Sequence, residues 1–341
     1  MKVSRSSHYS IKRIKEGKNI GLHVTIDSDF SLFRYRAINK YTTEQFLNDE
    51  LFATSSSGFN DPYDSKVMFS SRKIKNHIKQ KLLNNESLMR KLLQENGLKL
   101  KQINDLVNSI YEKVLAPNYS ADNNVYAFAC FSTDVTQEIM WAHYANLATG
   151  FALEYSYYDL VGLNIEHQKI VGNLVEKLNI LNGYTFDSDI IENPLLPVVY
   201  QNNKYDITNI CNDHIDEVLD RLDKDGKCNQ FQLLLDNVLK PDISNLANEF
   251  IQNVYFRKKN PWSYENEWRL ICYNYSVFVG QINNPYVSIG KIAPKAIYLG
   301  ENISSFNKRS LIAIARDKQI DVYEMKTIIV GKTLKLKAFK L

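Results

Sequence analysis

The feature that most constrains this chain is the alternation of short β-type segments with two long blocks of helical periodicity. Apolar residues recur at three- and four-residue intervals over about 71–115 and again over about 209–256, as they do in helices that bury one face. The β-type segments between and around these blocks are short, for example Ser31–Arg36, Val125–Phe131 and Glu267–Tyr273. This order predicts an α+β fold, with a mixed β core and two helical insertions at its periphery.

The same pattern predicts how the chain is divided. Residues 1–28 are polar and basic, and we expect them to form an irregular N-terminal arm. Residues 29–341 then form a single α+β domain that carries the two insertions, with a two-domain split as the alternative. Gly226 and Pro241 should divide the second helical block into at least three helices.

Further elements are expected in the centre and at the end of the chain. Asp134 is expected to cap a helix over about 135–146, with Gln137 three residues later completing a capping box. The remaining strands are expected at Leu51–Thr54, Gly150–Tyr155, Ala296–Gly300, Asp321–Glu324 and Thr327–Ala338.

Composition excludes several classes of protein. No apolar run approaches the roughly 20 residues of a membrane-spanning helix, and the basic start lacks an apolar signal region, so we expect a cytoplasmic protein without membrane contact. The net charge of +4 is small and spread along the chain, which permits nucleic acid as a partner without requiring it. Cys130, Cys211, Cys228 and Cys272 show no metal-ligand spacing, so neither a structural zinc site nor a disulfide framework is expected.

Four clusters place polar residues beside aromatic ones at the ends of expected strands. They are Arg34-Tyr35-Arg36, Phe59-Asn60-Asp61-Pro62-Tyr63-Asp64, Cys130-Phe131-Ser132-Thr133 followed by Met140-Trp141-Ala142-His143-Tyr144, and Trp262-Ser263-Tyr264-Glu265-Asn266-Glu267-Trp268-Arg269. In this order they resemble a family of uncharacterised prokaryotic proteins, domain of unknown function 2971. The resemblance extends over roughly Leu32–Phe339, apart from the helical insertions, and implies no activity by itself.

The order of elements also resembles, more distantly, the core of ADP-ribosyltransferases. That resemblance implies NAD as a substrate, with Arg36, Ser132 and Glu267 as catalytic residues. The residues that it implies for contact with NAD are Tyr35, Arg36, Thr133, Trp141, His143 and Tyr144. The sequence lacks the full His-x-Thr and Ser-Thr-Ser triplets of the best-known members.

The residue types suit this chemistry. Cleavage of the bond between nicotinamide and ribose develops positive charge that a carboxylate such as Glu267 can stabilise, and the guanidinium of Arg36 can bind a pyrophosphate through two hydrogen bonds. We therefore expect Arg36, Ser132, Tyr144 and Glu267 to line one pocket.

Structural roles compete with these catalytic ones. Glu265 and Glu267 could pair with Arg269 or Arg36, and Asp64 could bind Arg36. Trp141 and Trp268 suit a core, and His143 suits a hydrogen-bonded, semi-buried position.

Three classes of function remain open. The first is an NAD-dependent ADP-ribosyltransferase-like enzyme or NAD glycohydrolase, of a kind that serves as a toxin or an antiphage effector, with a nucleic acid or protein target. The second is a metal-dependent nuclease or phosphoesterase built on Asp61, Asp64, Glu265 and Glu267. The third is a non-catalytic sensor or assembly module of a defence system, and oligomers are compatible with all three.

Overall fold

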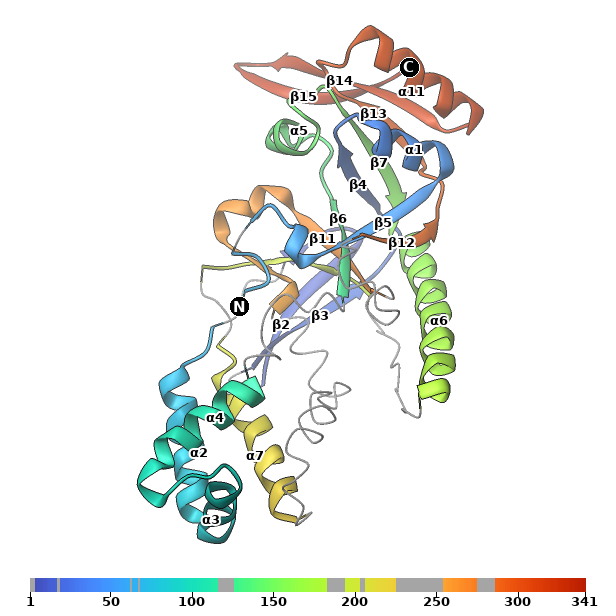
Figure 1. The fold of residues 1–341 in the computed structure, drawn as a ribbon. Coiled ribbons are helices and arrows are strands. Elements are labelled where there is room, and N and C mark those ends of the chain that lie inside the picture. Colours follow the sequence, from blue (N-terminus) through green and yellow to red (C-terminus); the bar gives the residue numbers. More distant parts are fainter. Residues whose placement is uncertain are drawn as a thin grey trace. The chain divides into compact units, whose positions relative to one another are not determined.

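The computed structural model describes residues 4–16, 19–61, 63–66, 68–115, 126–182, 194–202, 206–224, 254–274 and 286–341 (Figure 1). The chain forms two units. The first consists of Met1–Asp64, Asn124–Asn202 and Tyr255–Leu341, and the second of Ser65–Asn123 and Asn203–Val254. Within the described ranges, no helix combines the length and the apolar character that a membrane crossing requires.

The second unit is helical and has its own core. Its helices are α2 (Ser71–Asn84), α3 (Glu86–Glu95), α4 (Ile103–Leu115) and α7 (Thr208–Lys224). The apolar faces of these helices pack against one another in a buried cluster, whose members include Ile74, Ile78, Leu82, Leu92, Ile215 and Val218. The two helical blocks of the sequence thus pack against each other. The helix boundaries expected at Gly226 and Pro241 lie outside the described residues.

The first unit is built on a mixed sheet. Its strands are β4 (Ser31–Arg36), β5 (Glu50–Ser55), β6 (Tyr126–Ser132), β7 (Phe151–Ser156), β8 (Leu195–Pro197), β11 (Glu267–Tyr273), β12 (Tyr286–Lys291), β13 (Ala296–Leu299), β14 (Asp321–Val330) and β15 (Thr333–Lys340). The order is β12-β5-β6-β4-β7-β13-β14-β15, and β11 joins β6 to β8. Among these described strands β13 and β14 pair in parallel and the other pairs are antiparallel. The expected mixed α+β class is confirmed.

Strand β6 is the junction of this sheet. At its end, Ser132 lies opposite Glu267 of β11 and also opposite Phe33 of β4. Residues directly opposite each other project to the same face, and successive residues alternate between faces. Ser132, Glu267 and Phe33 therefore share one face, while Arg34 and Arg36 project from the other.

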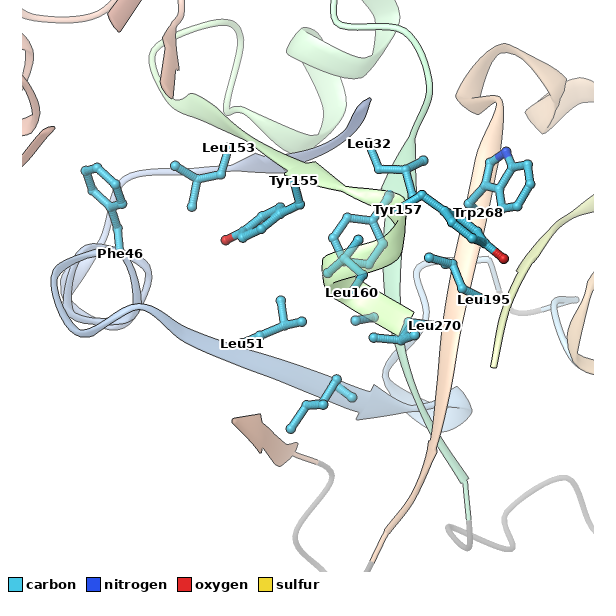
Figure 2. Packing of buried hydrophobic residues seen from close by; sticks show 14 of the residues in the cluster. Leu32, Phe46, Leu51, Leu153, Tyr155, Tyr157, Leu160, Leu195, Trp268 and Leu270 are labelled. Carbon is cyan, nitrogen blue, oxygen red and sulfur yellow. The ribbon is translucent and has the colours of Figure 1, made fainter. Parts of the chain in front are cut away.

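The face that carries Leu32 is covered by helix α6 (Tyr157–Asn182) and helix α1 (Lys40–Asn48). Figure 2 shows Tyr157 and Leu160 of α6 beside Leu270 and Trp268 of β11. Full burial of each such side chain contributes about 1.5–3 kcal/mol. This contiguous core fixes the position of β11, whose other face carries Glu267 and Arg269.

The Glu267 face is packed near β4 by helix α5 (Glu138–Tyr144). Trp141 is almost fully buried there, and its ring lies edge-on against Tyr35 with centroids 5.1 Å apart. The indole Nε1 donates to the carbonyl of Val135 at 2.7 Å. These contacts fix the orientation of α5 and hence of His143 and Tyr144 at its end.

The prediction that residues 1–28 form an irregular arm is wrong. Strands β1 (Ser4–Arg5), β2 (Tyr9–Glu16) and β3 (Asn19–Ile26) form an antiparallel sheet. Tyr9, Val24 and Ile26 pack against the main core, with polar and basic residues between them. That alternation is typical of a strand with one buried face, and the density of lysine and arginine obscured it.

The capping box expected at Asp134 is also wrong. Helix α5 begins at Glu138, and its N-cap Gln137 makes no capping hydrogen bond with its side chain. Asp134 instead accepts hydrogen bonds through Oδ1 from the backbone N and hydroxyl of Thr136, at 2.8 and 2.7 Å. An aspartate that binds a backbone amide two residues later stabilises a turn, and this turn delays the helix.

Gly150 allows the chain to return from α5 into β7 at close range. A Cβ atom at this position would lie 2.1 Å from the carbonyl oxygen of Arg36 and 2.9 Å from that of Ala145. Both neighbours are backbone atoms, which cannot move aside as a flexible side chain can.

We therefore predict that Gly150→Ala lowers the free energy of unfolding by about 2–3 kcal/mol. The control is Gly162→Ala in helix α6, where a Cβ atom meets nothing within 4 Å and alanine should stabilise the helix by about 0.5–1 kcal/mol. Denaturant titration of both variants is the measurement. Equal stability of Gly150→Ala and the wild type would contradict the close approach.

Candidate functional site

A cluster of five buried ionisable side chains lies on the Glu267 face of the first unit. Its members are Asp64, Lys258, Glu265, Glu267 and Arg269, and each side chain is between 1% and 6% exposed. Asp64 follows the short helix η1 (Ser56–Gly58), Lys258 ends β10 (Arg257–Lys258), and Glu265 ends η4 (Asn260–Glu265). Buried charges are stable only when they are paired, so the geometry of this cluster matters to the whole unit.

Arg269 is the centre of the cluster. Its guanidinium donates to both carboxylate oxygens of Asp64, from Nη1 at 2.9 Å and from Nη2 at 2.5 Å. It also donates to Glu267, from Nε at 2.8 Å and from Nη2 at 3.1 Å, and to the carbonyl of Tyr255 from Nη1 at 2.5 Å. Two bidentate carboxylates satisfy the planar guanidinium in a way that lysine could not.

Lys258 joins the other side of the same carboxylates. Its Nζ lies 2.6 Å from Glu265 Oε2, 3.3 Å from Glu267 Oε2 and 3.8 Å from Asp64 Oδ2. The ammonium also lies 4.8 Å from the centroid of the Trp262 ring, a favourable contact for a cation. Glu267 is thus shared by both cations, whereas Glu265 pairs with Lys258 and not with Arg269.

The local backbone explains why both glutamates reach this cluster. Asn266 separates them and adopts a left-handed conformation with φ 44°, which asparagine tolerates better than most residues. Glu265 ends a 3-10 helix and Glu267 begins β11. The turn therefore lets two residues from different elements project to the same place.

The charges of the cluster do not balance. Three carboxylates and two cations give a net charge of −1 when all are ionised. Burial and the neighbouring Glu267 carboxylate raise the pKa of Glu265 to about 7. Burial alone would raise the pKa of Glu267 too, but Arg269 and Lys258 hold it well below its usual range. Glu265 is therefore the group that exchanges a proton near neutral pH.

Tyr144 connects Glu265 to the surface. Its hydroxyl donates to Glu265 Oε1 and accepts from the exposed Asn60 amide Nδ2 at 2.7 Å. Burial and the Glu265 carboxylate raise the pKa of Tyr144, so the phenol keeps its proton. A half-buried hydroxyl bonded to a carboxyl group that titrates near neutrality is a suitable proton relay.

Aromatic rings lie next to this relay. His143 is exposed, and its Nδ1 is 2.9 Å from the hydroxyl of Tyr264. The rings of Tyr264 and Trp262 lie 6.1 Å apart at an interplanar angle of 35°. Both are only partly buried, so their surfaces are available to a planar ligand.

The structure brings together only some of the residues predicted for the site. Glu267 and Tyr144 both contact members of the cluster, and Ser132 lies opposite Glu267 in the sheet. The fully buried Ser132 hydroxyl, however, accepts from the backbone N of Asp134 at 3.2 Å. Of the four residues expected to line one pocket, Tyr144 is the one that is both partly exposed and hydrogen-bonded to the cluster.

The other predicted ligand residues are mainly structural in their contacts. The buried Tyr35 donates its hydroxyl to the carbonyl of Asp134 at 2.6 Å, and Trp141 is packed against it. Thr133 donates its backbone N to the carbonyl of Asn266 at 3.3 Å. Their predicted contacts with NAD stay predictions.

Arg36 is not brought to Glu267. It lies opposite Phe151 of β7 and two residues from Arg34, on the face of the sheet that Glu267 does not share. The expected pairing of Asp64 with Arg36 is wrong, because Arg269 binds both oxygens of Asp64. A shift of one residue in the register of β4 would move Arg36 to the Glu267 face, so strand register determines whether the two side chains can meet.

Lys258 and Asn60 are the site residues whose contacts the sequence did not reveal. Asn60 belongs to one of the four polar–aromatic clusters, but nothing in its sequence context indicates a contact with Tyr144. Lys258 stands between Arg257 and Lys259 with no distinctive spacing. Only the fold shows which of these three basic residues is buried among carboxylates.

A metal centre on the same carboxylates is not favoured by this arrangement. Lys258 and Arg269 occupy the positions where a cation would balance Asp64, Glu265 and Glu267. Across the described ranges no group of three His, Cys, Asp or Glu residues could hold a metal ion. Asp61 forms a turn, accepting at Oδ1 from the backbone N of Tyr63 at 2.9 Å.

The fold and the site together define an α+β protein with a buried ionic cluster and a surface-linked tyrosine. Residues 140–270 match the family described as protein of unknown function (DUF2971), which confirms for this part of the chain the resemblance drawn from the motifs. The matched segment includes both Tyr144 and Glu265. No curated protein and no solved structure matches the chain.

The first prediction for this site concerns Glu267→Gln, which removes the charge that Arg269 and Lys258 share. Removing one partner of a buried ion pair costs about 3–5 kcal/mol, so we expect the variant to melt well below the wild type. Glu44→Gln is the control, because Glu44 is 52% exposed and lies 4.0 Å from Lys40. A Glu267→Gln protein as stable as this control would refute the role of Glu267 in the cluster.

A second prediction concerns the pH dependence of stability. The pKa of Glu265 is raised from 4.5 to about 7, so between these values the unfolded chain loses the proton while the folded protein keeps it. The contribution of Glu265 to stability is therefore full below about pH 4.5, falls as pH rises, and is lost above about pH 7. We expect the unfolding free energy of Glu265→Gln, minus that of the wild type, to rise over this interval. A flat or falling difference would contradict the raised pKa.

Proposed function

We propose that this protein is an enzyme in which Tyr144 and Glu265 act as a general acid–base pair, and that its substrate is NAD or a related nucleotide. The observation that carries the proposal is the hydrogen bond from the Tyr144 hydroxyl to the buried Glu265 carboxyl group, whose pKa is raised to about 7. General bases work best when their pKa lies near the operating pH. A purely structural carboxylate in an ion pair has its pKa lowered, as Glu267 does.

The aromatic surroundings favour a planar substrate group. Trp262, Tyr264 and His143 are partly or fully exposed beside the relay. Their faces could stack on nicotinamide or another base, a contact that contributes about 0.5–1.5 kcal/mol per aromatic pair. Together with the distant resemblance to ADP-ribosyltransferases, this makes NAD the first substrate to test.

The proposed reaction needs only NAD and an acceptor, which is either water or a hydroxyl group of the target. The bond between ribose and nicotinamide breaks, and its electron pair leaves with nicotinamide. The oxygen of water, or of a hydroxyl group on the target, then bonds to the ribosyl carbon, and its proton passes through Tyr144 to Glu265. The negative charge of the cluster stabilises the positive charge that develops on the ribose.

This proposal gives Glu267 and Arg269 a positioning role. Together with Lys258 they hold the cluster charge that sets the pKa of Glu265. It also replaces Glu267 by Glu265 as the carboxylate nearest to the reaction. This step requires no catalytic role for Ser132 or Arg36.

The test is nicotinamide release from NAD by purified Tyr144→Phe protein. Loss of a general acid–base group reduces turnover by about a hundredfold or more, whereas loss of its hydrogen bonds costs only about 1 kcal/mol of stability. Tyr41→Phe is the control, since Tyr41 is 73% exposed.

Two results would count against the proposal. Undiminished turnover in Tyr144→Phe would exclude the relay. A folded wild-type protein that releases no nicotinamide, with water or with a nucleic acid or protein acceptor, would exclude NAD as its substrate.

A further inference from the structure

The face of the sheet opposite the ionic cluster carries two arginines, Arg34 and Arg36, that have no carboxylate partner among the described residues. Arg34 is 9% exposed, and its Nη2 donates to the carbonyl of Phe52 at 2.6 Å. Its Nη1 is buried and has no hydrogen-bond partner in the described part of the chain. A buried donor without an acceptor is costly, and a water molecule or an ion that binds there would satisfy it.

Arg36 lies two residues away on the same face and is only partly buried. Among the described residues, its guanidinium makes neither a hydrogen bond nor an ion pair. Burial lowers the pKa of both Arg34 and Arg36, and the nearby charge of Arg36 lowers the pKa of Arg34 further. Two like charges are therefore held close together with no counter-charge.

The neighbouring groups cannot supply that counter-charge. Tyr155 lies beside both arginines, and burial raises its pKa to about 12. Burial also raises the pKa of Cys130, so the thiol keeps its proton. Asp49, which acts on Tyr155, is already paired with Lys318 at 2.8 Å. Figure 2 shows the Tyr155 ring among apolar side chains of this face, including Leu153 and Leu51.

We propose that Arg34 and Arg36 form a binding site for a phosphate group. The charge argues for phosphate over a single carboxylate, because a phosphate group carries about −1.5 to −2 at neutral pH and could balance both arginines. Guanidinium groups bind phosphate oxygens through paired N–H donors, and the unpaired Nη1 of Arg34 is one such donor. Arg36 is the more exposed of the two arginines.

This site is distinct from the Tyr144–Glu265 pair in two respects. Strand register puts its arginines on the other face of the sheet. It also needs no bond to be made or broken. Phosphate binding and nicotinamide release can therefore succeed or fail separately.

The experiment uses inorganic phosphate as the ligand, at an ionic strength held constant with sodium chloride. It measures the melting temperature as a function of phosphate concentration, and the affinity by isothermal titration calorimetry. The melting temperature of the wild type should rise with phosphate and approach saturation, as a ligand that binds the folded state requires. In Arg36→Gln the affinity should fall by about tenfold or more, since half of the paired donors are lost. Without phosphate, the same variant should melt no lower than the wild type, because one of two repelling charges is gone.

Three further samples make the result specific. Arg309→Gln, in an exposed position of helix α11 (Ser305–Asp317), should bind phosphate as the wild type does, and so should Tyr144→Phe. A nucleoside monophosphate that binds more tightly than inorganic phosphate would identify a nucleotide as the source of the group, and equal affinity would identify phosphate itself. Stabilisation by acetate equal to that by phosphate, or unchanged affinity in Arg36→Gln, would overturn the proposal.

Discussion

A fully buried guanidinium, that of Arg269, has to be neutralised by the fold around it. The positions of Asp64 and Glu267 follow from this requirement, because an unpaired charge at this depth would not be compatible with a stable protein. The segments that supply these residues are separated by much of the chain. Two of the motifs that carry the family resemblance, those containing Asp64 and Glu265–Arg269, meet in this cluster, and Tyr144 of a third motif contacts it.

The cluster has one carboxylate more than it has cations, and this excess distinguishes it from a purely structural network. Glu267 lies between the two cations, which stabilise its negative charge and lower its pKa. Glu265 is the carboxylate in excess, and its pKa is raised. The hydrogen bond from Tyr144 connects the titrating carboxyl group of Glu265 to the half-buried Tyr144 hydroxyl, which the exposed Asn60 contacts in turn. Stability and proton transfer are thus assigned to two neighbouring glutamates that differ mainly in how many cations each contacts.

The sequence predicted the strands of this site better than its contacts. Ser31–Arg36 and Glu267–Tyr273 are strands with the expected bounds, because their β-type composition is strong over six or seven residues. Helix α6 escaped prediction, since Asn164, His167 and Gln168 interrupt its apolar face with buried polar groups that bond to β11 or to each other. The partner of Asp64 and the face of Arg36 depend on strand register and on long-range pairing, and no local spacing encodes either.

The acid–base function of this site depends most directly on the protonation of Glu265. Carboxyl carbon NMR of protein labelled at glutamate, with Glu265→Gln used to assign the resonance, measures that pKa without any assumption about substrate. We predict a glutamate signal that titrates at about pH 7, disappears in Glu265→Gln, and shifts its midpoint in Tyr144→Phe. If the Glu265 signal instead titrates near the ordinary value of 4.5 or below, Glu265 is a structural ion-pair partner and the acid–base site does not exist.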